Sequence, residues 1–225
     1  MAQAQSKPNW FVIGISAAVV VVLIALGVVV VWMNNRATDG GPAPKGAIIN
    51  SDTGAITFGK GDKVIDTYID LMCPACNAFE QTFSEQLKTL AGEDKITLNV
   101  HPIAILDRYS AGSNYSSRAA AAVYCVAEKS PDKTLDYIAS LYQNQPEENS
   151  TGLSDAQLQD YAKQAGAADA ASCMEKGTYL KYGVAQAKAH SIQGTPTIEL
   201  DGKLVEGQSL QEIFAKVDTW VKAIN

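Results

Sequence analysis

Hydrophobic positions along the chain follow three patterns, and each pattern predicts a different kind of structure. Residues 11–33 contain no charged residue and are dominated by Val, Ile, Ala and Leu, which predicts a membrane-spanning helix. Residues 64–69 are rich in β-branched and aromatic side chains, which predicts a buried strand. Phe79, Phe83 and Leu87 recur every four residues, which predicts the core-facing stripe of an amphipathic helix.

The apolar run at residues 11–33 would be about 35 Å long as a helix, which is enough to cross a bilayer. Trp10 and Trp32 bracket it in the positions of interfacial anchors. A cleaved signal peptide is the alternative, but its apolar core is about 7–15 residues long and a small-residue cleavage site follows it, whereas none follows here. We therefore expect an uncleaved signal-anchor, a short cytoplasmic tail at residues 1–10 and a flexible linker at residues 34–46.

Residues 47–225 have the size of one domain, and strand and helix patterns alternate along them. Short strands are expected at Ala47–Ile49 and Ala55–Phe58, and the strand–helix–strand order that follows predicts two parallel strands joined by a crossover helix. Helical stripes fill an insertion at about residues 103–192, in which Ser154-x-x-Gln157 predicts a helix start. A strand pair and a last helix follow, so we expect an α/β domain.

The stretch Cys73-Pro74-Ala75-Cys76 lies between the predicted strand and the predicted amphipathic helix. Pro74 suits the first helical turn, where its missing N–H costs nothing. Cys73 then lies at the helix N-terminus, where free N–H groups and the helix dipole favour a thiolate. Cys76 is placed one turn further on, where it can resolve a mixed disulfide. The motif therefore predicts a redox-active pair with Cys73 and Cys76 as catalytic residues.

A zinc site or a structural disulfide is the alternative interpretation of this motif. Zinc would need a second close pair of ligands, but Cys125 and Cys173 are far apart and the chain has only two, unpaired, histidines. We therefore expect no metal and no cofactor. If Cys73 pairs with Cys76, the other two cysteines remain for a structural disulfide, which would stabilise the fold by about 4 kcal/mol. Two buried free thiols are the alternative.

A second motif, Gly194-Thr195-Pro196-Thr197, precedes a predicted strand. A proline cannot donate to a strand ladder, so it belongs at a first or edge position. A tight turn of this kind is also a candidate place for a cis peptide bond between Thr195 and Pro196. An ordinary turn is the alternative.

The two motifs together, Tyr68-x-Asp70-x-x-Cys73-Pro74-x-Cys76 and Gly194-Thr195-Pro196-Thr197, resemble the DsbA-like branch of the thioredoxin superfamily over about residues 50–225. The resemblance implies a thioredoxin-like fold with a helical insertion and makes Pro196 the cis-proline that faces the active site. It also implies that Thr195 offers backbone groups to an extended substrate peptide. An acid at the position of Asp70 is frequent in that family and could move protons at Cys76; a solvated strand-end aspartate is the alternative.

The resemblance also implies a function, a protein thiol–disulfide oxidoreductase that introduces disulfides into reduced secreted or envelope proteins. A membrane quinone-linked partner of the DsbB or VKOR type would reoxidise it. Two cysteine pairs suit an oxidising compartment, which places the domain outside the cytoplasm. The net charge of −6 argues against nucleic acid as a ligand. A reductase or isomerase on the same fold, or a membrane-tethered binding module with a structural C-x-x-C, is the alternative.

Overall fold

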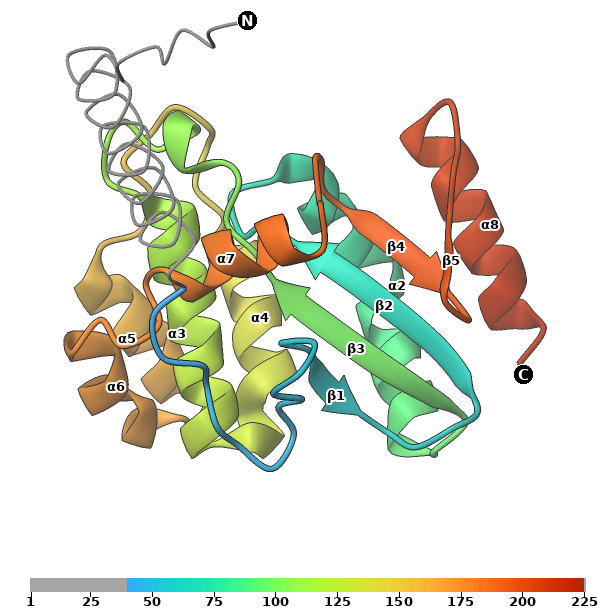
Figure 1. Cartoon of the computed structure of the whole chain (residues 1–225), viewed down its shortest axis with the longest axis horizontal. Coiled ribbons are helices and arrows are strands. Elements are labelled where there is room, and N and C mark those ends of the chain that lie inside the picture. The colour runs from blue at the N-terminus through green and yellow to red at the C-terminus, as the bar shows by residue number, and fades with distance from the viewer. Residues whose placement is uncertain (1–39, 225) are drawn as a thin grey trace, which may run out of the picture. The chain divides into compact units, whose positions relative to one another are not determined.

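The computed structural model describes residues 40–224, which form one mixed β-sheet with helices on both faces (Figure 1). The strands are β1 (Ile56–Phe58), β2 (Lys63–Ile69), β3 (Ile96–Pro102), β4 (Thr197–Leu200) and β5 (Lys203–Leu204), in the spatial order β1-β3-β2-β4-β5. The helices are α2 (Pro74–Gly92), α3 (Tyr115–Lys129), α4 (Thr134–Gln143), α5 (Asp155–Gln164), α6 (Ala171–Glu175), α7 (Tyr182–Ala189) and α8 (Leu210–Lys222). This is a thioredoxin-like α/β fold.

The centre of the sheet is the pair β2 and β3, which run parallel with Ile65 opposite Leu98. The predicted parallel pair with α2 as its crossover helix is therefore confirmed. Strands β1, β4 and β5 each pair antiparallel with their neighbours. The strand predicted at Ala47–Ile49 is wrong, because only Ile49 forms a bridge, to Ile56. A single bridge is what remains when a segment is too short to extend the ladder.

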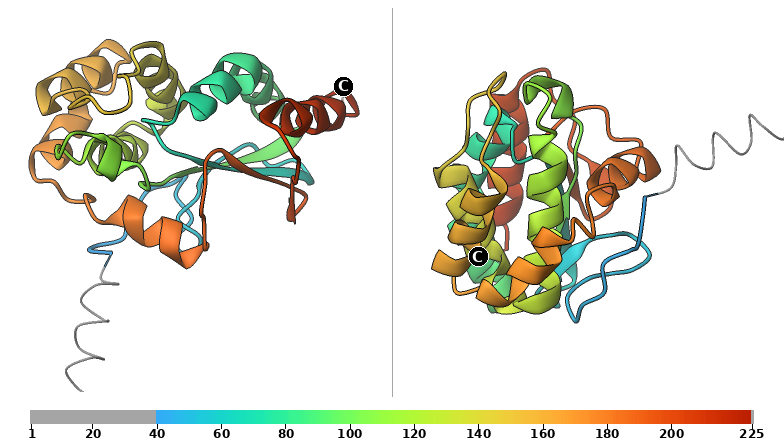
Figure 2. Two further views of the ribbon diagram at one scale, coloured as in Figure 1. Left: turned by 90° about the horizontal axis from the view of Figure 1, so that it is seen from above. Right: turned by 90° about the vertical axis from the view of Figure 1, so that its left-hand side faces the viewer.

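One face of the sheet is covered by α2 and α8, and α7 lies on the other face (Figure 2). The stripe predicted for α2 is buried, and the Phe214 ring of α8 packs edge-on against Phe79 and Phe83, with ring centroids 5.7 and 5.4 Å away. Each such ring contributes about 2–3 kcal/mol of burial free energy. Packing on this scale holds α2, and with it the cysteine motif, rigidly against the sheet.

Helices α3, α4, α5 and α6 gather beside the sheet, in the segment between β3 and β4 (Figure 1). Helix α5 begins as the sequence predicts, because the Ser154 hydroxyl accepts a hydrogen bond from the backbone N–H of Gln157 at 3.3 Å, and the Gln157 side chain accepts one from the Ser154 N–H at 3.0 Å. Reciprocal capping of this kind satisfies two backbone donors that the first turn leaves free. Of these four helices, α4 is the one that packs against α2.

Among residues 40–224, no helix combines the length and apolar character that crossing a bilayer requires. The anchor predicted at residues 11–33, the tail at residues 1–10 and the first half of the linker at residues 34–46 lie outside the described residues.

Candidate active site

Cys73 and Cys76 lie at the start of α2, and both are free thiols. Cys73 is the N-cap residue with extended backbone angles, and Pro74 occupies the first helical position, as the sequence predicts. Only 6% of Cys73 is exposed and Cys76 is completely buried. Both residues are therefore buried, but Cys73 keeps a small exposed fraction whereas Cys76 has none.

The surroundings of Cys73 favour its thiolate. The Cys76 thiol donates to the Cys73 sulfur and lowers its pKa, burial opposes this, and the Thr195 side chain and the backbone N–H groups of Cys76 and Ala75 lower the pKa further, to about 6. The two backbone donors are the free N–H groups that a helix start presents. A thiol with this pKa is mostly ionised at neutral pH, and the thiolate is the form that attacks and leaves in disulfide exchange.

Cys76 has the opposite environment. Complete burial raises its pKa well above the ordinary value, and the neighbouring Cys73 sulfur adds to this effect. Cys76 therefore keeps its proton while Cys73 gives up its own. The two sulfurs are therefore suited to different steps. The Cys73 thiolate is suited to exchange with other molecules, and the buried Cys76 thiol is suited to react with Cys73.

The segment Thr195–Pro196 lies directly beside Cys73, although 122 residues separate them in the chain. Antiparallel pairing of Tyr68 in β2 with Thr197 in β4 brings it there. The Thr195–Pro196 peptide bond is cis, and the Cys73 thiol donates a hydrogen bond to the Thr195 carbonyl at 3.2 Å. The two motifs that carry the sequence resemblance thus meet at one sulfur.

Asp70 is completely buried just behind the cysteine motif. One carboxylate oxygen accepts hydrogen bonds from the Met72 N–H at 3.0 Å and the Ser116 hydroxyl at 2.7 Å. The other accepts from the backbone N–H groups of Ile105 at 2.9 Å and Leu106 at 3.0 Å. Burial raises the pKa of Asp70, and these four bonds offset part of that effect. Its position ties β2, the loop after β3 and α3 together.

A cluster of polar side chains that sequence patterns do not reveal also contacts the motif. The Gln145 side-chain nitrogen donates to the carbonyls of Leu71 at 3.1 Å and Cys73 at 2.9 Å. Asn77 donates to the Gln145 side-chain oxygen at 3.0 Å and to the Tyr142 carbonyl at 3.1 Å. Tyr142 and Gln145 follow the cysteine motif by more than 60 positions, and no periodicity or motif connects them to the cysteines.

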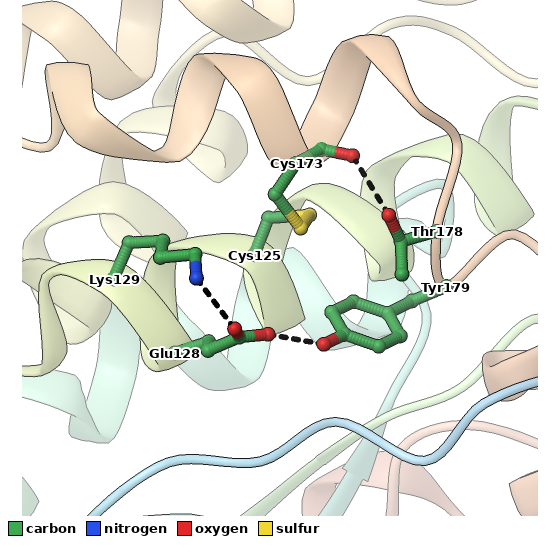
Figure 3. The surroundings of a disulfide bond; sticks show 6 residues. All are labelled: Cys125, Glu128, Lys129, Cys173, Thr178 and Tyr179. Atoms are coloured by element: carbon green, nitrogen blue, oxygen red, sulfur yellow. Dashed lines mark hydrogen bonds and ion pairs between the residues drawn. A yellow bond between two sulfur atoms is a disulfide. The ribbon is translucent and has the colours of Figure 1, made fainter.

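The other two cysteines form a disulfide that links α3 to α6, with Cα atoms 5.6 Å apart (Figure 3). Around it, the Tyr179 hydroxyl donates to the Glu128 carboxylate, which also accepts from Lys129 at 2.6 Å. Cys125 and Cys173 therefore hold the helical segment together and are unavailable for exchange with Cys73. Residues 40–224 contain no group of three or more His, Cys, Asp or Glu side chains placed to hold a metal ion.

Comparison with known proteins gives a family match over most of the chain. A family model described as thioredoxin matches residues 54–219. Among solved structures, oxidised DsbA of Mycobacterium tuberculosis is 29% identical with a TM-score of 0.65, covering 74% of this chain and 92% of that one. Reduced DsbG of the same organism, described as a disulfide bond oxidoreductase, is 27% identical with a TM-score of 0.65, covering 76% and 91%.

A curated relative of a different kind is the serine/threonine-protein kinase PknE of Mycobacterium tuberculosis, which is 32% identical over 163 residues. The match covers 64% of this chain, but the chain spans only 28% of the kinase. The likeness therefore concerns one part of a longer protein.

Proposed function

We propose, from the premise that this chain belongs to the thioredoxin family, that it is a dithiol oxidase for exported proteins. The broader class is a thiol–disulfide oxidoreductase of the DsbA or DsbG type.

The observation that carries the proposal is the contrast between the two sulfurs at the start of α2. Cys73 keeps 6% of its surface exposed and its pKa is lowered to about 6, whereas Cys76 is completely buried and its pKa is raised. A stabilised Cys73 thiolate stabilises the reduced enzyme, so the oxidised enzyme has a strong tendency to accept electrons. This favours oxidation of substrate dithiols over reduction of their disulfides.

In the proposed reaction, a substrate thiolate attacks Cys73 in the Cys73–Cys76 disulfide. The bond between the two enzyme sulfurs breaks, Cys76 takes its electron pair and a proton, and a mixed disulfide joins the substrate to Cys73. A second substrate thiolate then attacks the substrate sulfur of that bond. Cys73 leaves as a thiolate, the substrate gains a disulfide, and the enzyme holds the two electrons. Thr195 would align the substrate chain through its backbone.

Turnover requires removal of these two electrons, for which we assign a membrane reoxidant of the DsbB or VKOR type. The anchor at residues 11–33 would hold the domain near such a partner, on the outer side of the membrane. The Cys125–Cys173 disulfide supports an oxidising compartment, because structural disulfides rarely persist in the cytoplasm.

The test is oxidation of a reduced, unfolded protein by the purified oxidised enzyme, with glutathione equilibration giving its reduction potential. The wild type should restore activity to reduced ribonuclease, Cys73→Ser should not, and Cys76→Ser should accumulate a mixed disulfide at Cys73. Full activity of Cys73→Ser would refute the assignment. A potential near that of cytosolic reductants, about −270 mV, would instead indicate a reductase, and faster repair of scrambled than of reduced ribonuclease would indicate an isomerase.

A further inference from the structure

A side chain of the helical segment holds the active-site turn from the side. One of the carbonyls that it contacts, that of Cys73, also accepts a backbone hydrogen bond from the Asn77 N–H at 3.2 Å. Gln145 lies two residues beyond the end of α4, and its amide nitrogen has two hydrogens. One reaches the Leu71 carbonyl at 3.1 Å and the other reaches the Cys73 carbonyl at 2.9 Å. Gln145 therefore forms hydrogen bonds with the main chain on both sides of Met72, just before α2 begins.

The orientation of the Gln145 amide is itself fixed. Its oxygen accepts a hydrogen bond from Asn77 at 3.0 Å, and the second hydrogen of the Asn77 amide goes to the Tyr142 carbonyl at 3.1 Å. All four amide hydrogens of the two side chains are thus used, and the bonds leave one arrangement of each amide group. Networks in which every donor is satisfied rigidify their surroundings more than isolated bonds do.

The carbonyl of Cys73 is a sensitive place for such a contact. Its peptide unit ends in Pro74, which has no N–H, so the carbonyl is the one polar group through which the N-cap residue can be held on that side. The backbone N–H groups of Ala75 and Cys76, which lower the Cys73 pKa, belong to the next two peptide units. Turning the Cys73 peptide plane would turn these donors away from the sulfur.

We infer that Gln145 is a positioning residue for the redox centre: through the carbonyls of Leu71 and Cys73 it holds the start of α2 in the orientation that directs backbone donors at the Cys73 sulfur. The inference rests on the proposed function for its biological meaning. In this role, a residue of the helical segment contributes to the reactivity of the Cys73 thiol. Asn77 is the residue that orients Gln145.

The decisive variant is Gln145→Met, which keeps the length of the side chain, adds no charge and removes both donors. The thiolate absorbance of Cys73 in the reduced protein, followed against pH, should give a higher pKa than in the wild type. The equilibrium constant with glutathione should shift about fivefold toward the oxidised enzyme, the factor that corresponds to one hydrogen bond of about 1 kcal/mol. Asn144→Ala is the matched control, because the Asn144 side chain donates to the Ser140 carbonyl of its own helix at 2.9 Å and not to the active-site turn, and it should change neither quantity.

A second variant keeps the inference testable if Gln145→Met is poorly folded. Asn77→Ala leaves the donors of Gln145 in place but removes the group that orients them, so it should shift both quantities in the same direction by a smaller factor. The double variant should match Gln145→Met alone, because the two residues act in series. Additive shifts would show that they act separately and would overturn the inference.

An unchanged Cys73 pKa and an unchanged glutathione equilibrium in Gln145→Met would also overturn it, even if the melting temperature fell, since Gln145 would then serve stability alone. These readouts need no protein substrate. A wild-type protein that fails to oxidise ribonuclease while its thiol responds to Gln145→Met would therefore refute the proposed function and leave this inference standing.

Discussion

Replacing Glu80 by glutamine should stabilise the reduced protein, by an amount that grows as pH rises from about 4.5 to about 7 and then levels off. Glu80 lies on α2 one turn after Cys76 and lines a small, mainly apolar cavity with Thr67, Ile69 and Ile138. Lys88 lines the same cavity but is paired with Asp136. Burial raises the pKa of Glu80 from 4.5 to about 7, and the nearby charge of Glu85 adds to this.

The size of the effect follows from that pKa. One pKa unit corresponds to about 1.4 kcal/mol, so ionising Glu80 costs about 3 kcal/mol more in the folded protein than in the unfolded chain. Because the folded state holds the proton more tightly, the contribution of this group to stability is complete below pH 4.5 and is lost as pH rises through 7. Glutamine does not ionise, so the variant should gain up to about 3 kcal/mol over the wild type by pH 8.

The assay is urea unfolding of both proteins at pH values from 5 to 8.5 with a reductant present, and the free energy of unfolding of the wild type is subtracted from that of the variant at each pH. Subtraction removes the contributions of other titrating groups, Cys73 included. Glu85→Gln is the control, because removing the charge of this exposed side chain on the same helix should lower the Glu80 pKa without abolishing the titration. A difference between Glu80→Gln and wild type that does not change with pH would refute the reasoning.

Three further outcomes are expected. Alkylation of the reduced protein by iodoacetamide should occur at Cys73, with a rate that rises to half its maximum near pH 6, while Cys76 stays unmodified; a midpoint near pH 9 would contradict the described environment. Asp70→Asn should lower the free energy of unfolding by about 3 kcal/mol, because the new NH2 group faces donors where the carboxylate accepts four hydrogen bonds. Removing the Cys125–Cys173 disulfide by double alanine substitution should cost about 4 kcal/mol, measured by urea unfolding, and leave the iodoacetamide profile unchanged; a shifted profile would show that the two pairs are coupled.

Local patterns predict the sheet and its main helix because the forces that form them act over few residues. The α2 stripe at Phe79 and Phe83 and the capping pair at Ser154 and Gln157 each depend on side chains three or four positions apart. The strand expected at Ala47–Ile49 failed because extension of a ladder depends on a neighbour, and the sequence does not say how far that neighbour runs.

The residues of the active site likewise fall into those that local sequence predicts and those that it does not. Cysteine spacing and helix-start chemistry predict the roles of Cys73 and Pro74, and a motif predicts that of Thr195–Pro196. The hydrogen bonds of Asp70 with Ile105, Leu106 and Ser116 join residues more than thirty positions apart, and so do the contacts of Gln145 with Leu71 and Cys73. No period or motif encodes such pairs, because any polar side chain that reaches the right carbonyl would serve equally well.

The chain order of the site has a consequence for synthesis. Cys73, Cys76 and Cys125 leave the ribosome before Cys173, and Thr195 arrives later still. A nascent chain therefore presents three sulfurs, none of which yet has its full set of folded neighbours, so incorrect pairing has an interval in which to occur. The distinct reactivities of the cysteines are therefore established only after the last third of the polypeptide, which contains Cys173 and Thr195, has folded onto the rest of the domain.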